Sequence, residues 1–241
     1  MSANLTAPRP IRCVVTVEGR RWRLRTWPGP PRWTGPPILL IHGLGATPAY
    51  FRPLAERLAA VCPTIAPSLP GFGGTDRRRG ERSIAALATA VAEYWAAAGT
   101  EPALVVGHSL GAQIVTSLAA RYPDLVAGVA LVSPAPDPFG GDLPRHAARL
   151  VLDATREPFT LLRLLVPRYL TSGLTYLSTT IRAMDRYRWE PDLPRVAAPA
   201  LVLRGERDPV VSRLWATTLA RDLPAAHLIE ISNAPHGVIY S

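Results

Sequence analysis

The segment 107–111, which reads GHSLG, constrains the fold of this chain more than any other part of the sequence. It follows the apolar run 103–106 and opens the helix-patterned run 110–122, so Ser109 is expected at a sharp turn between a strand and a helix. A residue held in a strained backbone conformation needs very small neighbours, and both glycines of the segment meet that need. The G-x-S-x-G pattern in this setting predicts a nucleophilic serine. The alternative is a serine that only shapes the turn.

Apolar runs of strand length alternate with runs of helical periodicity along most of the chain. Two short strands joined near Glu18-Gly19 are expected to form an opening hairpin. Further strands are expected at 38–41, 64–67, 103–106, 126–133, 200–204 and 226–231, and helices at 48–62, 83–98, 110–122 and 211–222. This alternation predicts an α/β fold with a mostly parallel central sheet flanked by helices.

The pattern changes between residues 134 and 198. Strand signals disappear, helical periodicity dominates, and several prolines break it. We therefore expect a core made of residues 1–133 and 199–241, with 134–198 inserted as a helical lid. Such an insertion would lie over the C-terminal edge of the sheet, where sheets of this kind bind ligands.

A serine hydroxyl needs a base and an orienting acid to become a nucleophile at neutral pH. His236 is the candidate base, because it alone among the histidines lies in a loop after the last expected strand. The other four are His42 and His108 in glycine motifs, His146 in the inserted segment and His227 in a strand. Asp208 follows the strand 200–204 and is the candidate acid, and Asp137 is its competitor. The order Ser109, Asp208, His236 is the one expected for a nucleophile elbow in an α/β sheet.

Two backbone N–H groups are expected to stabilise the negative charge that develops on the substrate oxygen. Leu110 follows the nucleophile and supplies the first. Leu44 lies in the glycine-rich segment 42–45, after the strand 38–41, and supplies the second. The structural alternative is a plain turn before the helix at Pro48. A dinucleotide fingerprint fails because Pro48 stands where the third glycine should be.

The net charge of +9 raises the question of whether the chain binds nucleic acid. All 27 basic residues are arginine, and seven of them lie within residues 1–35. Between Arg21 and Trp27 they alternate with other residues, as expected for a strand with one solvated face. No nucleic-acid-binding fold or set of stacking aromatic residues accompanies them, so no nucleic-acid partner is expected. No metal-ligand spacing is found either, and no metal or cofactor is expected.

No apolar run is long enough to span a membrane, and residues 1–10 contain no apolar core of a secretory signal. The two cysteines, Cys13 and Cys62, can form at most one disulfide. These features predict a reduced protein in the cytoplasm.

Four segments together resemble the α/β-hydrolase fold superfamily, in particular its lidded esterases and C–C hydrolases. They are 42–45 (HGLG), 70–73 (PGFG), 107–111 (GHSLG), and 205–208 (GERD) with 235–237 (PHG). The resemblance runs from about residue 38 to the end of the sequence. It implies hydrolysis through a covalent acyl-enzyme, without a cofactor. The sequence ends five residues after His236, where members of this superfamily usually carry one more helix that helps to hold the histidine loop.

The sequence therefore predicts a serine hydrolase that cleaves an ester, or a thioester or lactone, of a small molecule with a hydrophobic portion. Two alternatives stay open. One is hydrolysis or lysis of a C–C bond by the same three residues, and the other is a ligand-binding relative without activity.

Overall fold

The computed structural model describes residues 9–78, 81, 83–98, 101–141, 143–171 and 174–240. Within these residues, one sheet of eight strands runs through the molecule in the order β1-β2-β4-β3-β5-β6-β7-β8. The strands are β1 (Ile11–Val17), β2 (Arg20–Trp27), β3 (Ile38–Ile41), β4 (Thr64–Pro67), β5 (Ala103–His108), β6 (Val126–Val132), β7 (Ala200–Gly205) and β8 (Ala226–Ile231). β1 and β2 form an antiparallel hairpin, and β2 also pairs antiparallel with β4. The remaining neighbours in the sheet, from β4 through β3 and β5 to β8, are all parallel. The predicted α/β class with a mostly parallel sheet is confirmed.

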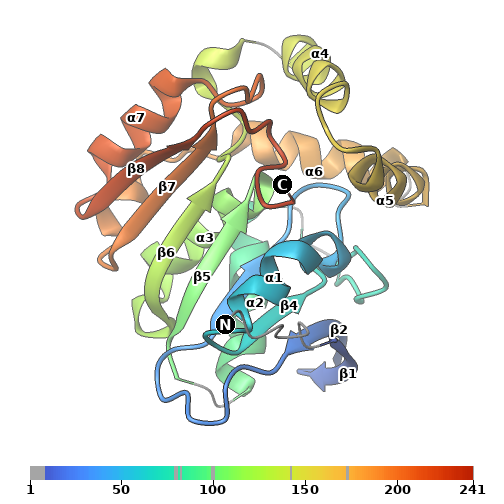
Figure 1. Ribbon diagram of the computed structural model, residues 1–241, viewed down its shortest axis with the longest axis vertical. Coiled ribbons are helices and arrows are strands. Elements are labelled where there is room, and N and C mark those ends of the chain that lie inside the picture. Colours follow the sequence, from blue (N-terminus) through green and yellow to red (C-terminus); the bar gives the residue numbers. More distant parts are fainter. Residues whose placement is uncertain are drawn as a thin grey trace, which may run out of the picture.

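Helices cover both faces of the sheet because successive strand residues point to opposite sides. Leu39 and Ile41 of β3 belong to a core shared with α2 (Ile84–Ala97), α3 (Leu110–Arg121) and α7 (Arg213–Asp222). Ile38 and Leu40 belong to a second core on the other face, shared with α1 (Arg52–Leu58). Figure 1 shows the sheet between these layers, with the β1–β2 hairpin at one side.

Along β2, buried and exposed residues alternate as the sequence predicts between Arg21 and Leu24. Trp22 and Leu24 of β2 are buried, whereas Arg21 and Arg23, which alternate with them, are exposed. Arg21 pairs with Asp76, with 3.0 Å between the guanidinium Nε and the carboxylate. Arg21 and Arg23 therefore lie on a solvated face, whereas Arg20 of the same strand is buried and pairs with Glu81.

Two of the expected helices differ in their bounds. The helix expected over 48–62 is a 3₁₀ turn at Pro48–Phe51 followed by α1, because Pro53 lacks an N–H and fits only the first turn of a new helix. The helix expected from residue 211 begins at Arg213, because Ser212 has an extended backbone (φ −73°, ψ 155°) and is the N-cap. Ser212 then caps α7 by accepting a hydrogen bond from the N–H of Trp215.

In its described part, the segment between β6 and β7 contains three α-helices, two short 3₁₀ turns and no strand. The α-helices are α4 (Leu143–Ala154), α5 (Phe159–Thr171) and α6 (Leu174–Arg186). In Figure 1 they lie together at the upper right, next to the C-terminal segment drawn in red. The insertion of residues 134–198 into the core and its action as a lid both stay predictions. In the part of the chain that the structure describes, every helix is too short or too polar to cross a membrane.

Candidate active site

Ser109 lies at the turn between β5 and α3, with φ 55° and ψ −118°. A non-glycine residue in this region is strained by about 1–3 kcal/mol, and such strain is typical of functional sites. Gly107 and Gly111 are required at this turn because a side chain at either position would clash with the backbone. A Cβ on Gly107 would lie 2.3 Å from the carbonyl oxygen of Gly111, and a Cβ on Gly111 would lie 2.1 Å from the carbonyl oxygen of Ile41. The sharp strand–turn–helix geometry predicted from the sequence is therefore present.

His236 and Asp208 meet at the C-terminal edge of the sheet. Nδ1 of His236 lies 2.9 Å from Oδ2 of Asp208, and both residues are buried. The other carboxylate oxygen of Asp208 accepts hydrogen bonds from the N–H groups of Val210 (2.8 Å) and Val211 (3.0 Å). Burial alone would raise the pKa of Asp208, but the His236 ring and these donors outweigh it, so its pKa is lowered. Asp208 is thus an ionised carboxylate fixed against the imidazole.

Asp137, the competing acid, lies elsewhere. Its Oδ1 accepts from the N–H of Phe139 at 2.8 Å, and its Oδ2 accepts from the N–H of Ser212 at 2.9 Å. Both oxygens are therefore used to hold the loop after β6 against the start of α7. The structure brings Asp208, not Asp137, to His236.

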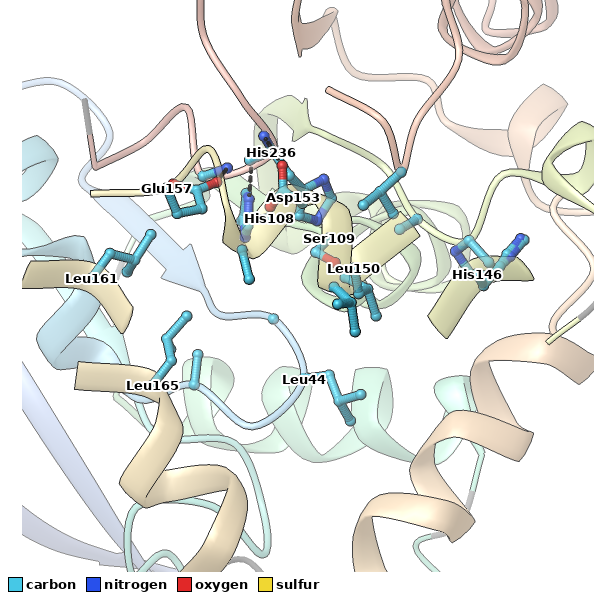
Figure 2. Close-up of a pocket in the computed structure, with 18 of the residues that line it drawn as sticks. Leu44, His108, Ser109, His146, Leu150, Asp153, Glu157, Leu161, Leu165 and His236 are labelled. Carbon is cyan, nitrogen blue, oxygen red and sulfur yellow. Dashed lines mark hydrogen bonds between the residues drawn. The ribbon is translucent and has the colours of Figure 1, made fainter. Parts of the chain in front are cut away.

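The second ring nitrogen of His236 is directed away from Asp208. Nε2 is buried and has no hydrogen-bond partner within the described residues, and His236 and Ser109 line the same pocket. Figure 2 shows the two side chains close together there. Hydrogen bonds between such groups are often long in a structure without substrate and shorten in the complex. This arrangement leaves Nε2 able to take a proton inside the pocket.

The peptide between Gly43 and Leu44 is oriented by His42. The N–H of Leu69 donates to Nε2 of His42 at 2.9 Å, so the ring proton is on Nδ1, which lies 2.8 Å from the carbonyl oxygen of Gly43. Burial lowers the pKa of His42 to about 4, which keeps the ring neutral. Because C=O and N–H of a trans peptide point in opposite directions, the N–H of Leu44 points away from His42. Leu44 itself lines the pocket that contains Ser109.

A buried hydrogen-bond chain joins this loop to the histidine loop. The N–H of Gly43 donates to the Tyr50 hydroxyl (3.1 Å), which lies 3.0 Å from Nδ1 of His108. Nε2 of His108 lies 2.9 Å from the carbonyl oxygen of His236, the contact drawn as a dashed line in Figure 2. Burial and the nearby His236 lower the pKa of His108 to about 3, so this ring is neutral. The sequence showed His108 only as part of a glycine motif and gave no signal for Tyr50.

Two carboxyl groups that sequence reasoning missed also reach the histidine loop. Asp153, near the end of α4, accepts a hydrogen bond from the backbone N–H of His236 at 2.9 Å. Glu157, in the turn after α4, accepts one from the N–H of Gly237. The backbone N–H of Glu157 donates to the carbonyl oxygen of Asp153 at 3.1 Å, so a single turn of chain joins the two residues, but only the fold shows which loop they meet.

The pocket has a volume of about 380 Å³ and mostly apolar walls. Apolar and aromatic side chains from several elements form them, namely Leu44, Tyr50, Leu150, Val151, Leu161, Leu162, Leu165, Ile181, Met184 and Val210. The charged residues in the described lining are acidic: Asp153, Glu157 and Asp185. No arginine belongs to that lining, in a chain with 27 arginines. The pocket therefore suits an uncharged, largely hydrophobic group.

Across the described ranges, no cluster of three histidine, cysteine or carboxylate side chains is suited to a metal ion. The polar groups beside Ser109 are instead a histidine paired with a carboxylate, together with the backbone N–H groups of the two glycine-rich turns. Such a set of groups can support acyl transfer.

Comparison with known proteins agrees with this geometry. An uncharacterized protein of Mycobacterium tuberculosis is 35% identical over 132 residues, which are 52% of this chain and 37% of that protein. The chain thus spans well under half the length of this relative. A pimeloyl-[acyl-carrier protein] methyl ester esterase of Xanthomonas oryzae pv. oryzae is 30% identical over 236 residues, with 84% of this chain and 88% of the esterase covered.

Solved structures show the same architecture. A membrane phospholipase A superposes with a TM-score of 0.81 at 25% identity, covering 96% of this chain and 81% of the other. An enol-lactonase from Burkholderia xenovorans gives a TM-score of 0.75 at 22% identity over 91% of each chain, which shows the fold alone. A model of the alpha/beta hydrolase family matches residues 38–241, the range that contains every group of the site described above. This chain therefore belongs to the alpha/beta hydrolase family.

Proposed function

We propose that this protein is a serine hydrolase that cleaves a carboxylic ester of a small molecule with a hydrophobic portion, with thioesters and lactones in the same chemical class. The observation that carries the proposal is the position of His236. Its Nδ1 is held by Asp208, and its unpartnered Nε2 is buried beside a pocket lined by Ser109. A base oriented by an acid next to a strained serine is the arrangement that activates a hydroxyl.

In the proposed reaction, Oγ of Ser109 attacks the ester carbonyl carbon while Nε2 of His236 takes the hydroxyl proton. The N–H groups of Leu44 and Leu110 donate hydrogen bonds to the oxyanion of the tetrahedral intermediate. The imidazolium then gives its proton to the departing alkoxide, which leaves as the alcohol, and an acyl-enzyme remains. A water molecule loses a proton to His236 and attacks the acyl carbon. Collapse of the second intermediate returns the proton to Ser109 and releases the acid.

The pocket supports an uncharged acyl or ring portion in the substrate. Its described lining is apolar apart from Ser109, the Tyr50 hydroxyl, three histidines and three carboxyl groups. The carboxyl groups, when ionised, would repel a carboxylate. Leu161 and Leu165 of α5 and Leu150 of α4 contribute to its walls. We propose that α4 to α6 act as the lid over the site.

Labelling with a fluorophosphonate tests the activated serine directly, because the probe forms a covalent bond with such a residue. We expect the parent protein to be labelled and Ser109→Ala to remain unlabelled. Hydrolysis of p-nitrophenyl acetate, butyrate and octanoate then measures the preference for acyl length, with p-nitrophenyl hemisuccinate as an anionic counterpart. A parent protein that is neither labelled nor able to hydrolyse any of these esters would exclude the proposed activity.

A further inference from the structure

The loop that carries His236 is held by carboxyl groups from outside the core. Asp153 accepts from the backbone N–H of His236, and Glu157 accepts from the N–H of the next residue, Gly237. Two consecutive N–H groups are thus bound by two side chains spaced four residues apart at the end of α4. Figure 2 shows Asp153 and Glu157 beside His236 at the wall of the pocket.

The close contact depends on glycine at position 237. A Cβ built there would lie 2.5 Å from Oε2 and 2.7 Å from Oε1 of Glu157. Any larger residue would push the carboxyl group off the loop. The absence of a side chain at Gly237 therefore makes room for the carboxyl group of Glu157.

Four titratable groups face the His236 ring or its backbone. They are Asp208 from the loop after β7, His108 from β5, and Asp153 and Glu157 from the end of α4. Burial alone would lower the pKa of His236, but the three carboxyl groups outweigh it, so its pKa is raised. Asp208 makes the ring contact, and the α4 pair adds charge from the side of the backbone.

We propose that Asp153 and Glu157 are positioning residues for His236, which fix the backbone of residues 236–237 and place two carboxyl groups beside it from the α4 side. The inference rests on the proposed function, because it concerns the same base. It couples the α4–α6 segment to the reaction: when α4 moves away from the core, the histidine loop loses both of its carboxyl acceptors. A displacement of about 1 Å in a catalytic group can cost on the order of a hundredfold in rate.

Charge and geometry can be separated by two kinds of substitution. In Asp153→Asn and Glu157→Gln, the amide oxygen can still accept the loop N–H, but the negative charge is gone. In Asp153→Ala and Glu157→Ala, both are lost. Asp137→Asn is the matched control, since Asp137 is also a buried carboxylate that holds two backbone N–H groups but lies away from His236. Thermal unfolding of each variant establishes that it is folded.

The kinetic measurement is kcat and KM for p-nitrophenyl butyrate as a function of pH. We expect the two alanine variants to lose about tenfold or more in kcat, with a smaller change in KM, and the amide variants to recover most of that loss. The acid limb of Asp153→Asn should move to lower pH by about half a unit or more, because His236 then loses its proton more readily. That of Glu157→Gln should move less, since burial raises the pKa of Glu157 to about 7 and the group is largely protonated on that limb. The control should show neither effect.

A second readout does not depend on turnover. The pKa of His236 can be followed by NMR of its ring Cε1 proton, assigned by comparison with His236→Gln. We expect it to fall in the double variant Asp153→Asn, Glu157→Gln and to stay unchanged in the control. If it falls while the parent protein hydrolyses no ester, the proposed function fails and the coupling stands. Folded alanine variants with full kcat and an unmoved acid limb, together with an unchanged His236 pKa, would overturn the inference.

Discussion

Replacement of Glu157 by glutamine should make the protein more stable at alkaline pH and leave its stability unchanged at acid pH. Burial, which the nearby Asp153 reinforces, raises the pKa of Glu157 from 4.5 to about 7. The unfolded chain therefore loses this proton at lower pH than the folded protein does. Because the folded state binds more protons in this interval, its stability falls as pH rises from about 4.5 to about 7. Glutamine has no proton to lose, and its amide oxygen can still accept the N–H of Gly237.

The magnitude follows from the two pKa values. At about 1.36 kcal/mol per pKa unit, a rise from 4.5 to about 7 corresponds to roughly 3 kcal/mol. Glu157 is only partly buried, and solvent screening reduces the expected effect to about 1–2 kcal/mol. For a chain of this size, that corresponds to an increase of about 2–8 °C in Tm at about pH 8.

The assay is urea unfolding of the parent and Glu157→Gln at several pH values, followed by circular dichroism. The difference between the two curves cancels the contributions of titrating groups that do not interact with Glu157. It should be near zero at about pH 4.5 and reach its full value above about pH 7. A difference that does not depend on pH, or a parent that is the more stable protein at about pH 8, would refute the reasoning.

Three further predictions concern the site itself. Ser109→Ala should lose about a thousandfold or more in kcat with an unchanged circular dichroism spectrum, since the nucleophile is removed and the turn is kept. Substantial residual turnover would move the nucleophile elsewhere. Asp208→Asn should lose about a hundredfold or more in kcat, because the amide no longer favours the productive tautomer, whereas Asp137→Asn should retain most of its activity. The reverse result would make Asp137 the acid. Gly237→Ala should lower kcat in the parent but have little effect in Glu157→Ala, because the Cβ clash is with that side chain. A double-mutant cycle of esterase activity measures this coupling, and additive effects would contradict it.

Much of the fold could be predicted from local sequence because its signals are local. Continuous apolar runs specify buried strands, and the alternation around Trp22 specifies a strand with one solvated face, because side-chain direction repeats every two residues. The serine turn is also local: Gly107 and Gly111 are the residues that its contacts require. The bounds of helices were less predictable. Ser212 has an extended backbone and caps α7, so the helix begins two residues later than periodicity predicts.

By itself the sequence determined the order of strands and helices, the strained turn at Ser109 and the chain order of serine, acid and histidine. Only the tertiary structure decided between Asp208 and Asp137, because both follow a strand and only contact shows which carboxylate meets the imidazole. It also decided that Asp153 and Glu157 hold the histidine loop. These contacts join residues about 80 positions apart, 83 for Asp153 and 80 for Glu157, and no local pattern records them. Local propensities act over a few residues, whereas the environment that sets the charge and position of His236 is assembled from four separate parts of the chain.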